Sequence, residues 1–138
     1  VSDLPALASR HGMTQTEAKN PNAHYWKKFL PLEPPRPSSF GKTYSVIKLT
    51  LWGLLRPNAE GTRYSKILVT VRVGNMRDGQ FFYANKFVQR YHVPGHFADN
   101  MEQLSHVEQA INRVEQVLDS PTADKIAARL RTKGFRRV

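Results

Sequence analysis

The chain has 138 residues, which suits one domain of ordinary size. It contains no cysteine, so a disulfide framework, a thiolate nucleophile and every metal site built on cysteine are excluded. Its 21 Lys and Arg against 11 Asp and Glu leave a formal net charge of +10, and its longest apolar run, Leu51 to Leu55, falls far short of the roughly 18 residues that a membrane-spanning helix needs.

The first 41 residues hold six of the nine prolines. Proline lacks an amide donor and biases the residue before it towards extended geometry. We therefore expect residues 1–41 to form an extended arm, with a short helix at Thr14–Lys19 that begins on capping-box spacing. The cluster Tyr25-Trp26-Lys27-Lys28-Phe29 lies in this arm. It either anchors the arm on the domain's own core or inserts into a groove of a partner.

Alternating apolar and polar residues predict two strands, at Thr43–Leu55 and Tyr64–Val73. A turn at residues 57–61 would join them as an antiparallel hairpin. A second turn at residues 74–79 precedes a third predicted strand at residues 81–92, whose aromatic residues also fit a helical stripe. These three segments predict one half-buried antiparallel sheet.

Apolar residues recur every three or four positions from residue 99 to residue 118, the period of an amphipathic helix. Ser120-Pro121 then opens a second helix, and Gly134 ends it with Phe135 folding back on it. The predicted fold class is α+β. Residues 42–138 form a single domain in which a three-stranded antiparallel sheet packs on two C-terminal helices, and residues 1–41 form an extended Pro-rich N-terminal arm.

Positive charge is concentrated in the predicted sheet, because residues 42–98 carry +7 whereas residues 99–119 carry −4. Side chains alternate along a strand, so one set of residues from the first two strands faces outward. That set contains no carboxylate: Tyr44, Lys48, Thr50, Trp52, Tyr64, Lys66, Thr70 and Arg72. Cations interleaved with aromatic rings favour binding of phosphate together with stacking on bases. Contact with a protein partner and a simply solvated face are the alternatives.

The carboxyl-terminal residues 129–137 form the densest basic cluster. The helix dipole accounts for part of this enrichment, but Arg136 and Arg137 lie beyond Gly134, where binding of phosphate by their planar guanidinium groups is the simpler explanation. The predicted aromatic contacts with RNA are Tyr25, Trp26 and Trp52. The predicted RNA-binding cations are Lys27, Lys28, Lys48, Lys66, Arg72, Lys86, Arg90, Arg129, Arg131, Lys133, Arg136 and Arg137.

The sequence shows no arrangement that predicts catalysis. His92 and His96 are spaced like a helical metal pair, but Pro94-Gly95 between them forbids a regular helix. Neither a nucleophile elbow nor a phosphate-binding glycine fingerprint is present. We therefore predict no enzyme activity, no catalytic residue, no metal, no cofactor and no small-molecule substrate.

A small, cysteine-free, strongly basic chain with one α+β domain and a Pro-rich extension resembles ribosomal proteins in build. Its first residue, Val1, is consistent with a removed targeting segment, so the chain resembles a mitochondrial ribosomal protein, although no specific family is identified. The resemblance implies a non-catalytic structural component of a ribosome in the mitochondrial matrix. It would bind rRNA phosphate through its basic surfaces and neighbouring ribosomal proteins through its arm. The alternative is a peripheral basic subunit of a large protein or membrane complex that does not contact RNA.

Overall fold

The structure is a computed structural model that describes residues 3–55, 64–93 and 100–138. In these residues one antiparallel sheet of seven strands has the order β1-β2-β3-β4-β6-β7, with β5 paired to β4 beside this path. The strands are β1 (Thr14–Thr16), β2 (Ala23–Pro37), β3 (Thr43–Leu55), β4 (Tyr64–Arg77), β5 (Gln80–Tyr83), β6 (Gln89–Val93) and β7 (Arg136–Arg137). The helices are α1 (Leu4–Arg10), the 3-10 turn η1 (Asn85–Phe87), α2 (Asn100–Gln116) and α3 (Ala123–Thr132). The predicted three-stranded sheet with an extended arm is therefore wrong.

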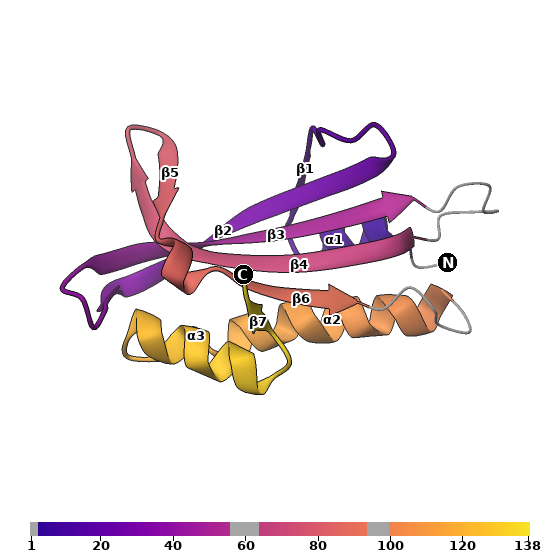
Figure 1. The fold of residues 1–138 in the computed structure, drawn as a ribbon. Helices are drawn as coiled ribbons and strands as arrows, with labels where there is room; N and C mark the ends of the chain where they lie inside the picture. The colour runs from indigo at the N-terminus through magenta and orange to yellow at the C-terminus, as the bar shows by residue number, and fades with distance from the viewer. Residues whose placement is uncertain (1–2, 56–63, 94–99) are drawn as a thin grey trace.

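The N-terminal segment forms α1, β1 and β2 and does not stay an extended arm (Figure 1). Asp3 caps α1 by accepting a hydrogen bond from the amide of Ala6 at 2.8 Å, and a proline stands in its first turn. The helix predicted at Thr14–Lys19 is wrong, because Thr14–Thr16 pairs with β2.

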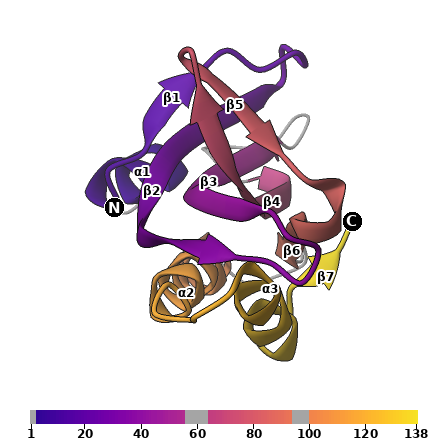
Figure 2. The same cartoon turned by 90° about the vertical axis from the view of Figure 1, so that its left-hand side faces the viewer.

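The prolines of β2 are compatible with a strand because of where they lie. β1 pairs with β2 only from Tyr25 to Lys27, so the prolines fall on a part of β2 that has no neighbour on that side. On the other side of β2, the register of its pairing with β3 shifts between Pro31 and Arg36. Figure 2 shows β2 bending there, so that its later half runs above α2 and α3. Arg36 holds this half by donating to the carbonyls of Ser120 at 2.8 Å and Leu118 at 2.9 Å.

The two clearest predicted strands are confirmed as β3 and β4, which pair antiparallel; the predicted turn at 57–61 lies outside the described residues. β4 continues to Arg77 and turns into β5 through Asp78 and Gly79, both with positive φ, as a two-residue hairpin turn requires. The predicted third strand at 81–92 is wrong. β5 and β6 pair with different stretches of β4, and η1 carries the chain from one to the other.

The predicted amphipathic helix is confirmed as α2, and the helix after it as α3. Thr122, not Ser120, caps α3 by accepting from the amide of Lys125 at 3.0 Å. Gly134 follows the helix with φ +97, and Phe135 is fully buried behind it, as predicted. No described helix combines the length and the apolar character that crossing a membrane requires.

The core lies between the sheet and the helices, and two tyrosines predicted to face outward belong to it. Ser65 is an extra residue in β4, because Leu54 pairs with Lys66 while Leu55 pairs with Tyr64. The bulge turns Tyr64 to the helix side, where it is fully buried and its hydroxyl lies 2.7 Å from His24 Nδ1. Tyr44 is buried against the rings of Phe40 and Phe87.

Candidate nucleic-acid interface

One face of the sheet, here called the open face, is turned away from α2 and α3 (Figure 1). The pairing of the strands places its side chains in rows across the strands. The first row is Thr14, Lys27, Thr50, Thr70, Arg90 and Arg136. The second row is Thr16, Tyr25, Trp52, Leu68 and His92. The third row is Phe29, Lys48 and Arg72, and Lys66 lies beside the second row. None of these residues is Asp or Glu, as predicted for the strands β3 and β4.

Three carboxylates form ion pairs on the helix side of the sheet: Glu108, Glu115 and Asp119, which belong to α2 and the turn after it. No open-face cation has a carboxylate partner among the described residues. Burial, followed by repulsion from the nearby cations Lys66 and Arg90, lowers the pKa of His92.

Three aromatic rings gather over two cations at one end of the open face. The Phe29 ring lies 5.8 Å from that of Phe81, which stacks on Tyr83 at 5.8 Å. The Lys48 ammonium lies 5.9 Å from the centre of the Phe29 ring and 5.8 Å from that of Phe81. Burial, followed by repulsion from Lys27 and Arg72, lowers the pKa of Lys48. Sequence reasoning did not assign Phe81 and Tyr83 to this site, although Asp78-Gly79 signals the hairpin that brings them there.

Two adjoining hollows lie on the open face. The first is lined by Tyr25, Thr50, Trp52, Lys66, Leu68, Thr70, Arg72 and Arg90. The second is lined by Arg72, Tyr83, Asn85, Val88, Arg90 and Val138. Arg72 and Arg90 line both hollows, so the hollows adjoin at these two residues.

These two arginines have few partners within the protein. Arg72 lies over the Tyr83 ring at 5.4 Å from its centre, and its Nη1 donates a long hydrogen bond of 3.5 Å to the hydroxyl of Thr50. The Nε of Arg90 is buried without an acceptor among the described residues. Neither arginine forms an ion pair with a described carboxylate.

Comparison with protein-family models, with curated proteins and with solved structures finds no match for this chain. Its function is therefore inferred from the residues of the sheet. Among the described residues, no three His, Asp or Glu side chains gather as a metal ion would need.

Some predicted RNA contacts are occupied by interactions within the protein. Trp26 is only 3% exposed and packs in the core, so the anchoring alternative describes it. The ammonium of Lys28 points to the helix side, where it donates to the carbonyl of His11 at 2.7 Å and lies 3.4 Å from Glu115. Arg129 binds Asp119 at 2.7 Å and the hydroxyl of Ser120 at 2.8 Å.

All of the remaining predicted cations except Arg136 lie apart from the open face. Lys86, Arg131 and Arg137 line a hollow beside α3 together with Asp124, and Lys86 also lies 5.0 Å from the centre of the Phe40 ring. Lys133 is exposed at the end of α3, where its carbonyl accepts a hydrogen bond from Arg113. Arg136 alone of the carboxyl-terminal cluster joins the open face, through its pairing with Arg90.

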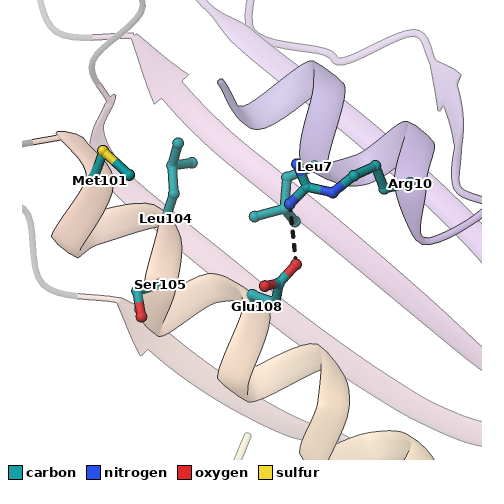
Figure 3. Close-up of a pocket in the computed structure, with 6 residues that line it drawn as sticks. All are labelled: Leu7, Arg10, Met101, Leu104, Ser105 and Glu108. Atoms are coloured by element: carbon teal, nitrogen blue, oxygen red, sulfur yellow. Dashed lines mark hydrogen bonds and ion pairs between the residues drawn. The ribbon is translucent and has the colours of Figure 1, made fainter. Parts of the chain in front are cut away.

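A further groove lies between α1 and α2 and is lined by residues of both helices (Figure 3). Leu7 and Leu104 form its buried floor. Across it, the Arg10 guanidinium lies 3.1 Å from the carboxylate of Glu108, and His11 Nε2 lies 3.0 Å from the same oxygen. The hydrogen bonds from His11 and Arg10 lower the pKa of Glu108. We assign this groove a structural role, since its charged residues are paired with each other.

The lowered pKa of Glu108 predicts how the ion pairs of Arg10 and His11 with Glu108 contribute to stability as the pH changes. A depressed pKa in the folded state stabilises the protein above the ordinary value of 4.5, and this contribution is lost as the pH falls through the folded-state pKa. Glu108→Gln should therefore lower the melting temperature at neutral pH and match the wild type in strong acid. The loss should be at most about 1 kcal/mol, because the pair is half exposed. The measurement is thermal unfolding against pH, with Glu17→Gln as the control; a loss of equal size in acid would contradict the prediction.

Proposed function

We propose that this protein is a non-catalytic RNA-binding component of a ribonucleoprotein particle, and that it holds RNA phosphate on the open face. The observation that carries the proposal is the composition of that face. Among the described residues, it combines cations that have no carboxylate partner with aromatic rings, and it contains no carboxylate, which suits phosphate neutralisation and base stacking together.

Folding alone does not account for this composition. On the helix side, Lys28 and Arg129 are used to fasten elements to each other through ion pairs and carbonyls. On the open face, Lys27 and Lys66 have no such partner among the described residues. Cations on neighbouring strands repel one another, so their grouping costs stability unless an anion is bound.

The particle that we propose is a ribosome, in which the protein would contact rRNA and neighbouring ribosomal proteins. This follows from its small size, its basic charge and its lack of cysteine. The mitochondrial location stays a prediction. The N-terminal segment is folded into the sheet, so contacts to neighbouring proteins would use its exposed surface.

Removing two open-face cations should weaken RNA binding. Lys27→Gln with Lys66→Gln deletes one half-buried and one exposed cation without touching the core. We expect affinity for RNA to fall by about tenfold or more at low salt, and the slope of log affinity against log salt to become shallower by about 1.4 to 1.8, since each neutralised phosphate contributes about 0.7 in a single strand and about 0.9 in a duplex. Fluorescence anisotropy with labelled RNA across a salt series measures both quantities.

The matched control is Lys125→Gln with Lys133→Gln, which removes the same charge from exposed positions on α3 and at its end, away from the open face. Equal losses from the two double variants would show that net charge, and not the open face, binds RNA. Treatment of a native lysate with RNase separates the two candidate assemblies. Release of the protein from the heavy sedimenting fraction supports the proposal, whereas retention with protein or lipid subunits favours a peripheral subunit of another complex.

A further inference from the structure

The shape of the open face narrows the class of nucleic acid that it can bind. Its two hollows meet at Arg72 and Arg90, with Tyr25 and Trp52 lining the first and Tyr83 lining the second. The Tyr83 ring already contacts Phe81 and the Arg72 guanidinium, so Tyr25 and Trp52 are the rings left for a base. Aromatic rings beside a pair of cations match a base and the phosphate next to it in one strand.

The place where the two hollows adjoin suits an anion. Neither Arg72 nor Arg90 forms an ion pair with a described carboxylate, and both residues line the two hollows. The Tyr83 ring holds the Arg72 guanidinium from one side at 5.4 Å. A single phosphate between the two arginines would receive charge-assisted hydrogen bonds from both.

The first hollow suits a base that is not stacked in a duplex. Trp52 and Tyr25 come from paired positions on β3 and β2, and Leu68 lies opposite Trp52 on β4, so this hollow has an apolar wall. A duplex would present phosphates, sugars and base edges to this wall, but not the face of a base. A single strand can place its bases against the rings.

The β4–β5 hairpin adds a barrier on the same side. Figure 1 shows it standing away from the face covered by α2 and α3. The Phe81 ring of this hairpin packs against the Phe29 ring of β2, so the two rings extend over the open face from β5 to β2. A flexible strand can follow a surface bounded in this way, whereas a stiff duplex would meet the hairpin first.

We infer that the open face binds single-stranded nucleic acid, with one phosphate at Arg72 and Arg90 and a neighbouring base against Trp52 and Tyr25. This inference rests on the proposed function and specifies its ligand. The shared chemistry of single-stranded RNA and single-stranded DNA fits the site, and a binding comparison distinguishes them.

The test compares a uridine oligomer, a thymidine oligomer and an RNA duplex of the same length, each binding to the full chain in the same buffer. We expect both single strands to bind at least about tenfold more tightly than the duplex, since only they gain stacking. Tighter binding of uridine identifies RNA as the ligand, and tighter binding of thymidine identifies DNA. Trp52→Ala should weaken single-strand binding by about 5- to 150-fold, the range for loss of one stacked base.

Phe82→Ala is the matched control, because Phe82 is exposed on the same hairpin and packs under Arg77 instead of on the open face. A second readout needs no destabilising change: single strands should quench the fluorescence of Trp52, and the quenching should disappear in Trp52→Phe while Trp26 still emits. A duplex that binds as tightly as the single strands, with Trp52→Ala unchanged, overturns the inference but leaves RNA binding standing. Failure of all three polymers to bind overturns the proposed function itself.

Discussion

Trp26→Ala should lower the free energy of unfolding by about 3–5 kcal/mol, a large share of the roughly 5–15 kcal/mol that stabilises a domain. The indole of Trp26 is 3% exposed and lies in the core between the sheet and the helices. Removing the indole leaves a cavity in the core beside β2, which neighbouring side chains fill only in part. Urea denaturation measures the loss.

Trp52→Ala is the comparison, because Trp52 sits half-buried on the opposite side of the sheet, one strand away. It should lose far less stability and should lose nucleic-acid affinity instead. If Trp26→Ala weakened binding while leaving stability unchanged, Trp26 would be a contact to the ligand, and the placement of β2 in the core would be contradicted.

Gly74→Ala should displace the β4–β5 hairpin. Gly74 lies where β4 leaves its pairing with β3 and enters its pairing with β5. A Cβ at this position would overlap the carbonyl oxygen of Phe82 and approach the ring of Phe81 to 2.9 Å. We expect a loss of about 1–3 kcal/mol in unfolding free energy, typical of overpacking, together with weaker single-strand binding, because Phe81 and Tyr83 would no longer meet Phe29 and Arg72.

Gly41→Ala separates the two effects. Gly41 has φ +82, and no atom lies within 4 Å of the place that an alanine Cβ would take, so alanine there costs about 1–2 kcal/mol of backbone strain and moves nothing on the open face. Both variants should therefore lose stability, measured by urea denaturation, and only Gly74→Ala should lose affinity, measured by anisotropy. Unchanged binding by Gly74→Ala would show that the hairpin takes no part in the site.

Local patterns were enough to predict β3, β4, α2 and α3, since their apolar spacing reports a face that must be buried. The same alternation predicted the carboxylate-free outward positions of β3 and β4, including Lys48, Trp52 and Arg72. It failed for Tyr64, because a single extra residue, Ser65, reverses the side of the sheet to which Tyr64 points.

The aromatic end of the site was beyond local reasoning for a different reason. Phe81 and Tyr83 approach Phe29 and Arg72 only because the hairpin rises from the sheet at Gly74. In the same way, Lys28 and Arg129 look like free cations in the sequence, and their partners Glu115 and Asp119 become neighbours only after packing.

By itself, the sequence determined the charge of this protein, its strongest strands and helices, and the side of the central strands from which carboxylates are missing. The tertiary structure decided that a proline-rich segment becomes part of the sheet and that Trp26 is buried. Proline signals an extended chain without stating what lies beside it. Whether such a chain stays free or becomes a strand depends on the unpaired hydrogen-bonding groups of β3, which lie elsewhere in the sequence and meet it only in the folded state.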